Sequence, residues 1–155
     1  MQDLRLNRCA WKVGLAVLGL AVVVPQVAKA EGRAETLEAI RAVENPHNSP
    51  QPGRHGELGP YQFRPATWRM HTRLPFSHAL ERAASQDVAI RHYEWIYRGL
   101  ARNGVSPTPY NIALAWNNGL SAVVRGRTSA AARYYAERVN NLAQEFRGAP
   151  LASVR

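Results

Sequence analysis

Cysteine is nearly absent from this sequence: the single one, Cys9, precedes an uncharged apolar run at residues 13–24. We predict that both are removed with a signal peptide, which leaves a chain without a thiol. That excludes a disulfide framework, a cysteine nucleophile and a cysteine-based metal site. Acidic residues are also scarce, because 20 Lys and Arg accompany 11 Asp and Glu, a net charge of +9.

The first 30 residues have the features of a secretory signal peptide. A basic head comes first, the apolar run "VGLAVLGLAVVV" follows, and Ala28 and Ala30 provide the small residues of a cleavage site. The run is short for a transmembrane helix, and an uncleaved membrane anchor is the alternative. We therefore predict a protein exported to the periplasm or the exterior of a bacterium.

The basic character survives the predicted cleavage. Residues 1–30 carry four basic residues and one acid, so 16 basic and 10 acidic side chains remain, a net charge of +6. Outside the cytoplasm a basic surface favours anionic partners such as cell-wall glycans, teichoic acids and lipid head groups. No basic–aromatic nucleic-acid motif is present, so we expect no nucleic-acid partner. Solubility alone is the simpler explanation of the charge.

Apolar residues recur at helical spacing after residue 30, which predicts a mainly α, compact helical domain at 31–148 and a tail at 149–155. The predicted helices cover 34–43, a short stretch from Pro65, 86–103, a helix from Pro109 that closes near Gly119, and a last helix from residue 130 that Gly148 stops. The predicted caps are Ser77, Ser85, Thr108 and Ser129. Residues 45–65 form a long loop rich in Pro, Gly, His and Asn, and such loops are commonly functional. A small β excursion within 47–64 is left open.

Glu44 is the candidate acid. It follows an apolar-faced helix just before the long loop, where the helix dipole disfavours a negative charge. Partial burial would raise its pKa in the same direction, as a general acid near neutral pH requires. The alternative is a solvated glutamate at a frayed helix end.

The stretch "GELGPYQFRPATW", residues 56–68, offers groups that suit a sugar, whose edges are polar and whose faces are apolar. Gly56 and Gly59 permit a tight backbone. Gln62 supplies an amide donor and acceptor, and Tyr61 supplies a flat ring. The alternative is a structural turn with a small Trp/Phe core.

Two stretches on predicted helices add to this set. "ALAWNNG", residues 113–119, places Asn117 at a helix end, where an ordinary Asn-Gly cap is the alternative. Tyr135 lies on the apolar face of the last helix, with its hydroxyl free to reach the edge of a cleft. The alternative for Tyr135 is a core tyrosine.

In order, these motifs resemble the soluble lytic transglycosylase domain of the lysozyme-like superfamily. That family carries Glu-Ser, Gly-x-x-Gly-Leu-Met-Gln, Ala-Tyr-Asn-Ala-Gly and a Tyr-x-x-x-Val helix. This chain has Glu44-Asn45, Gly-x-x-Gly-Pro-Tyr-Gln at 56–62, Ala-Trp-Asn-Asn-Gly at 115–119 and Tyr135-x-x-x-Val139. The stretch "LGPYQFRPATW" is also similar to an element of resuscitation-promoting factors. The departures are Asn45 for serine, Pro60-Tyr61 for Leu-Met and Trp116 for tyrosine.

The resemblance implies a lysozyme-like α+β fold and cleavage of the β-1,4 bond between N-acetylmuramic acid and N-acetylglucosamine in peptidoglycan. Glu44 would act alone, first as acid and then as base, and leave a 1,6-anhydro ring. Tyr135 would hydrogen-bond the acid or the N-acetyl group. The substrate-binding candidates are Gln62, Asn117, Tyr135, Tyr61 and Tyr110.

Glu57 separates two subclasses of this activity. Ordinary glycosidases use two carboxylates, and Glu57 is the other acid in the loop. Directed into the cleft it would favour a hydrolytic lysozyme, and solvated it would favour the single-acid transglycosylase. His47 and His55 share the loop but match no ligand spacing, so we expect no metal and no cofactor.

Two non-catalytic alternatives stay open. One is a cell-wall-binding protein of the same fold, which the Asn45 departure motivates. The other is a membrane-surface binder driven by arginines, whose binding would disappear at high salt. The expected partners are peptidoglycan glycan strands, with secretion-apparatus or cell-wall proteins as further candidates, and the expected state is a monomer.

Overall fold

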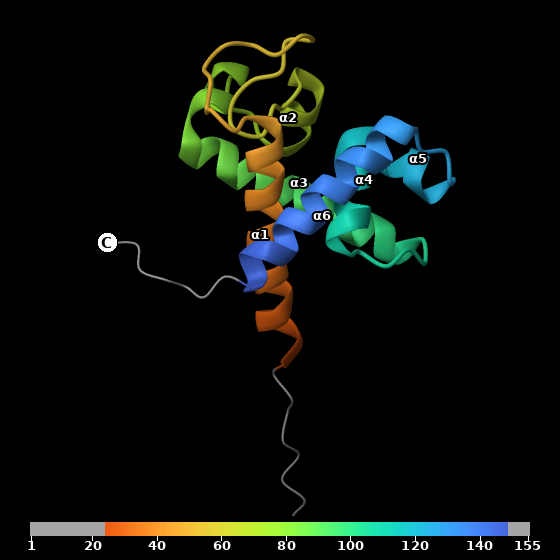
Figure 1. Cartoon of the computed structure of the whole chain (residues 1–155). Helices are drawn as coiled ribbons and strands as arrows, with labels where there is room; N and C mark the ends of the chain where they lie inside the picture. Colours follow the sequence, from red (N-terminus) through yellow and green to blue (C-terminus); the bar gives the residue numbers. More distant parts are fainter. Residues whose placement is uncertain (1–23, 149–155) are drawn as a thin grey trace, which may run out of the picture.

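The computed structural model describes residues 24–148, and the side chains from residue 32 onward (Figure 1). Six α-helices and one 3₁₀ helix make up this part of the chain: α1 (Val24–Glu44), α2 (Pro65–His71), η1 (Phe76–Leu80), α3 (Arg82–Arg102), α4 (Pro109–Asn118), α5 (Leu120–Val124) and α6 (Ala130–Gly148). The mainly helical class is confirmed. Within residues 24–148 no helix is long and apolar enough to cross a membrane.

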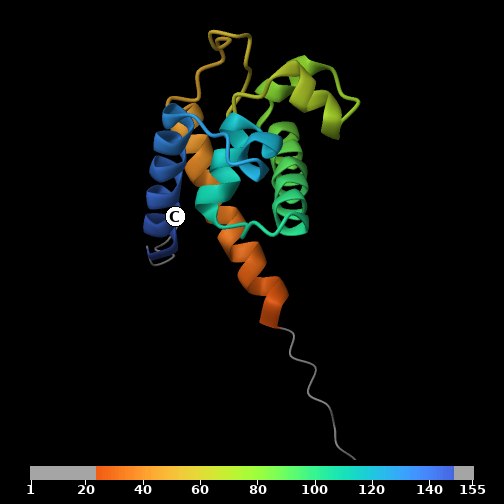
Figure 2. The ribbon, with the colours of Figure 1, turned by 90° about the vertical axis from the view of Figure 1, so that its right-hand side faces the viewer.

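Helix α4 lies at the centre of a bundle and contacts α1, α3, α5 and α6 (Figures 1 and 2). Small side chains allow these helices to approach closely: Ala39, Ala113 and Ala136, on α1, α4 and α6, are fully buried. Larger apolar residues such as Ile40 and Ile112 fill the remaining core. The bundle therefore fixes the end of α1, where Glu44 lies.

The segment between α1 and α3 is built differently. Residues 45–64 form the predicted long loop, and the short helix α2 packs on α3 and η1. Phe63 and Trp68 are buried as a small aromatic core, with ring centroids 6.0 Å apart. The β excursion is confined, among residues 24–148, to one antiparallel bridge between Leu58 and Phe63.

Helix starts test the predicted caps. Thr108 and Ser129 are confirmed, since each side-chain oxygen accepts a backbone N–H three residues on, at 3.2 Å from Asn111 and 3.1 Å from Ala132. Ser77 and Ser85 are wrong as caps. Ser77 lies inside η1, which begins at Phe76, and α3 begins at Arg82 and buries Ser85 in its first turn. Helix α1 begins upstream of the predicted cleavage site, and the cleavage itself stays a prediction.

Candidate functional site

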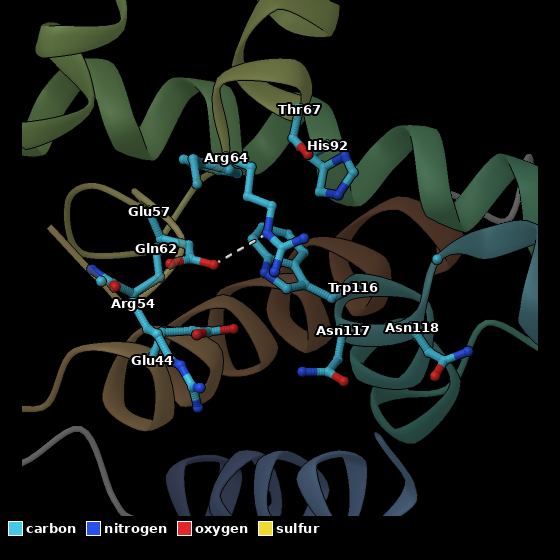
Figure 3. Close-up of a pocket in the computed structure, with 13 residues that line it drawn as sticks. Glu44, Arg54, Glu57, Gln62, Arg64, Thr67, His92, Trp116, Asn117 and Asn118 are labelled. Carbon is cyan, nitrogen blue, oxygen red and sulfur yellow. Dashed lines mark hydrogen bonds and ion pairs between the residues drawn. The ribbon is translucent and has the colours of Figure 1, made fainter. Parts of the chain in front are cut away.

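A pocket of about 460 Å³ opens between the long loop, α2, α3 and the C-terminal end of α4 (Figure 3). It combines carboxylates, guanidinium groups, amides and rings. Its lining residues are Glu44, Gly53, Arg54, Glu57, Gln62, Phe63, Arg64, Thr67, His92, Trp116, Asn117, Asn118 and Gly119. Segments far apart in the sequence thus bring Glu44, Gln62 and Asn117 to one site, as the sequence predicted, and Glu57, whose orientation the sequence left open, lines the same pocket.

Glu44 is the last residue of α1 and lies at this pocket. The Tyr135 hydroxyl, from α6, donates a hydrogen bond to Glu44 Oε1 at 2.8 Å, so the expected contact is present. Burial raises the pKa of Glu44 to about 7; the Tyr135 hydrogen bond opposes this shift, and the negative charge of Glu57 adds to it. Near neutral pH the carboxyl is therefore present in both protonation states, as proton donation followed by proton removal requires.

Tyr135 is fixed at this contact. Burial raises the pKa of its hydroxyl well above the ordinary value, and the adjacent Glu44 charge raises it further. Its hydroxyl thus keeps its proton throughout the physiological range and acts as a constant donor to the acid. The Tyr-x-x-x-Val pattern that suggested Tyr135 also places Val139 one turn on, fully buried against the bundle.

Glu57 lines the same pocket, and only 14% of its side chain is exposed. Oε2 accepts the backbone N–H of His55 at 2.8 Å, and Oε1 accepts Nε of Arg64 at 3.1 Å. Partial burial acts to raise the pKa of Glu57, but the backbone hydrogen bonds and Arg64 outweigh it, and the net pKa is lowered. Glu44 and Glu57 thus have opposite pKa shifts, which is the pattern of an acid beside a permanent anion.

Asn45, which stands where the lytic transglycosylases that the sequence resembles have serine, organises the loop. Its Nδ2 donates to the carbonyl oxygens of Ser49 at 2.9 Å and Gly59 at 3.3 Å, and its Oδ1 accepts the Ser49 N–H at 2.8 Å. The side chain is buried, at 6% exposure. Asn45 therefore ties the start of the loop to its middle, next to the acid.

Gln62 reaches the pocket through an unusual backbone. Its φ is 45°, in the left-handed region that non-glycine residues seldom adopt. Its backbone N–H and its Nε2 both donate to the Gly59 carbonyl, at 3.1 and 2.9 Å. No hydrogen bond from residues 24–148 engages Oε1, which leaves this acceptor for a ligand.

Gly53 makes room for two pocket side chains. A Cβ at this position would lie 2.7 Å from Gln62 Oε1 and 2.7 Å from Glu57 Oε2. Gly59 has a φ of 78°, and a Cβ there would lie 1.8 Å from the carbonyl oxygen of Ala79. The role predicted for Gly59 is confirmed, whereas that of Gly53 was not foreseen.

The two asparagines of "WNNG" differ in function. Asn117 is exposed at the pocket, and its side chain makes no hydrogen bond with the described residues. Asn118 instead links α4 to the start of α6, with Nδ2 donating to the Arg127 carbonyl at 3.2 Å and Oδ1 accepting from Ser129 Oγ at 3.3 Å. The cap at Gly119 is confirmed by its φ of 86°.

Tyr61 lies in the core, which corrects its prediction as a groove contact. It is only 2% exposed and does not line the pocket; its ring packs 5.9 Å from Phe63 and 6.1 Å from Trp116, centroid to centroid. Its hydroxyl donates to the side chain of Gln86. Trp116, half-buried below the pocket, is the ring that a ligand can reach.

Tyr110 is likewise not at the pocket. It lies in the first turn of α4, whereas Asn117 lies in the last turn, roughly 10 Å further along the axis. Tyr110 packs against the core cluster instead. The prediction that it contacts ligand in this groove is therefore not supported by its place in the fold.

His92 belongs to the pocket and was missed as a site residue. Its ring packs edge-on against Trp116 at 4.7 Å and stacks on Trp95 at 5.6 Å, while Nδ1 lies 3.0 Å from Nε2 of His71. Burial lowers the pKa of His92 to about 3, so the ring is neutral. The sequence did carry a signal for its inward position: His92 lies four residues, about one helical turn, before the buried Ile96. No group of three or more metal-ligating side chains occurs among the described residues.

The site therefore combines a partly buried, protonatable carboxyl with an ionised carboxylate, the amide groups of Gln62 and Asn117 and a reachable indole ring in an open pocket. Such an arrangement can donate a proton and can contact an uncharged polar ligand with apolar faces. No protein-family model matches the chain, and neither a curated protein nor a solved structure matches it. The function rests on the residues themselves.

Proposed function

We propose that this protein is an exported lytic transglycosylase that cleaves the β-1,4 bond between N-acetylmuramic acid and N-acetylglucosamine in peptidoglycan. The observation that carries the proposal is Glu44: a carboxyl with a pKa of about 7, held by Tyr135 at 2.8 Å, on an open pocket. The amides of Gln62 and Asn117 face the same space. The motif order of the sequence supports the same activity.

In the proposed mechanism protonated Glu44 donates its proton to the bridging oxygen as the glycosidic bond breaks. The N-acetyl group of the substrate stabilises the positive centre on the muramyl ring. Glu44, now a carboxylate, removes the proton of the 6-hydroxyl, whose oxygen closes the 1,6-anhydro ring. One carboxyl thus performs both proton transfers, and the proton returns to Glu44 for the next cycle.

Hydrolysis by a lysozyme-like mechanism is the second candidate, and the position of Glu57 favours it. Glu57 lines the pocket with Glu44, as two-carboxylate glycosidases require. Both of its oxygens are engaged, however, and the Arg64 ion pair lowers its basicity. We therefore assign to Glu57 the role of holding the loop and raising the pKa of Glu44, rather than activating water.

Mass spectrometry of the products formed from purified peptidoglycan tests the proposal. We expect muramyl ends lighter by one water than the hydrolysed ends, and we expect Glu44→Gln to abolish their release. Products with hydrolysed ends that disappear in Glu57→Gln would establish the lysozyme-like alternative instead.

A matched control distinguishes the loss of a catalytic group at Glu44 from the loss of any acidic side chain. Glu137→Gln removes an exposed carboxylate on α6, one turn from Asn140 and outside the pocket. It should leave product release unchanged. Binding of peptidoglycan without soluble fragments from the unsubstituted protein would overturn the catalytic proposal and leave the wall-binding alternative.

A further inference from the structure

Exposed apolar side chains of the described residues concentrate on one segment. Five large ones are more than a third exposed, and three of these lie within residues 70–80: Met70 at 54%, Leu74 at 47% and Leu80 at 43%. This segment holds the end of α2, the following loop and η1, which Figure 2 shows at the upper edge of the molecule, above α3. Such a concentration indicates a contact surface rather than scatter.

Arginines surround the first two of these side chains. Three shallow hollows lie on this surface: the first is lined by Met70, the second by Arg69 and Leu74, and the third by both Arg69 and Met70. Because the third shares a residue with each of the others, the three hollows adjoin. We call the residues that connect them the α2 patch; they are Arg69, Met70, Arg73, Leu74, Arg91 and Arg98. Half-buried Trp95 lines the first hollow with Met70.

Acidic groups offset part of this charge. Within the patch Arg91 pairs with Asp87 at 2.7 Å, and Glu94, which lines the same hollow as Arg98, pairs with Arg33 at 2.9 Å. Arg73 has no ion pair with an acid among residues 32–148. The α2 patch is therefore both positively charged and apolar.

We propose that the α2 patch docks on the surface of an anionic phospholipid bilayer. Arginine forks bind lipid phosphates, and each basic residue near an anionic bilayer contributes about fivefold in affinity. Met70 and Leu74, each next to an arginine in the sequence, would enter the interface, where the Trp95 ring is also favoured. A soluble wall polyanion would engage the arginines but leave the apolar side chains exposed to water, so the combination favours lipid.

Sedimentation with sucrose-loaded vesicles tests this surface without reference to glycan cleavage. The protein as isolated after export should bind vesicles that contain phosphatidylglycerol and not vesicles of phosphatidylcholine alone. Glu44→Gln should bind as the unsubstituted protein does. Binding that is equal on both vesicle types would overturn the proposal, whatever the outcome of the peptidoglycan digestion.

Two double variants separate the contributions of charge and apolar contact. Arg69→Gln with Arg73→Gln should weaken vesicle binding about 25-fold, since each arginine contributes about fivefold. Met70→Ser with Leu74→Ser should weaken it severalfold at unchanged net charge. Thermal unfolding of each variant verifies that these exposed substitutions leave the fold intact.

A control of equal charge is available in the loop between α5 and α6. Arg125→Gln with Arg127→Gln removes two exposed arginines outside the α2 patch and should change binding less than twofold. An equal loss in this control would show that net charge alone attracts the protein. Full binding by the Met70 and Leu74 variant, together with displacement by soluble teichoic acid, would assign the surface to a wall polymer instead.

Discussion

The helical bundle and the long loop at 45–64 are stabilised in different ways, although the pocket needs both. In the bundle, buried alanines such as Ala39 and Ala136 let helices pack along their length, so the stabilisation is spread over many contacts. In the loop, a few groups carry the structure: the Asn45 side chain and the Gly59 carbonyl connect three parts of the backbone. The bundle supplies the acid and the loop supplies its surroundings, so changes in the loop should affect the site most directly.

The largest effect expected from this difference is that of Gly59→Ala. Its φ of 78° disfavours alanine, and the new Cβ would meet the Ala79 carbonyl oxygen at 1.8 Å. We expect a loss of about 4 kcal/mol of stability, from the left-handed strain and the overpacking together, or a loop detached from η1. Peptidoglycan cleavage should be lost with it. Chemical denaturation and product release measure the two effects.

Gly56→Ala is the matched control, because Gly56 has the same φ of 78° but no atom within 4 Å of the place that its new Cβ would occupy. It should cost only about 1 kcal/mol, the strain component alone. Equal losses for the two variants would mean that the contact with Ala79 does not hold the loop.

The next effect concerns the acid supplied by the bundle. The pKa of Glu44 is about 7 in the folded protein and 4.5 ordinarily, so the folded state favours the protonated carboxyl. The stability that this protonation contributes is complete below pH 4.5 and is lost as the pH rises through 7, where the folded protein must hold a partly buried charge. Glu44→Gln should therefore stabilise the protein by about 3 kcal/mol above pH 8, at about 1.4 kcal/mol per pKa unit, and much less at pH 4. Denaturation curves at both pH values measure this; a gain that does not depend on pH would contradict the raised pKa.

Sequence periodicity located the helices α1, α3, α4 and α6 of the bundle because helix spacing and caps depend on nearby residues, but it placed the start of α3 at residue 86 and did not predict α5. The caps at Thr108 and Ser129 and the acid at the end of α1 follow from residues within one or two turns. The raised pKa of Glu44 was also predictable in direction, since partial burial disfavours the charged carboxylate. Its contact with Tyr135, 91 residues away in the sequence, came from the motif order rather than from periodicity.

The loop was harder to predict because neighbouring residues there face opposite ways. The left-handed backbone at Gln62 directs this side chain to the pocket, while Tyr61 next to it enters the core. Glu57 and Arg64, seven residues apart in an irregular loop, form an ion pair that no sequence periodicity indicates. Glu57 is therefore an anion bound by Arg64 rather than a solvated acid. Gly53 has a role visible only when its neighbours' side chains are placed.

A smaller effect is expected from Asn45→Ser, which places in the loop the serine of the lytic transglycosylases that the sequence resembles. Serine is too short to reach both the Ser49 and Gly59 carbonyls, so the side-chain link between the start and the middle of the loop is lost. We expect a stability loss of about 2 kcal/mol and lower activity. Asn141→Ser, at an exposed position on α6, should cost less than about 0.5 kcal/mol. Higher activity in Asn45→Ser would show instead that the serine supports the acid directly.

The smallest effect on stability, and the most specific test of the site, is that of Tyr135→Phe. It removes the hydroxyl that lowers the pKa of Glu44 and leaves the ring in the core, at a cost of about 1 kcal/mol. Because that hydrogen bond opposes the raised pKa, the alkaline limit of the pH–rate profile should move to higher pH while the maximal rate falls. A residue with only a packing role would lower the rate without moving the limit. A limit that stays in place, measured by product release between pH 5 and 9, would therefore assign Tyr135 to the fold and not to the acid.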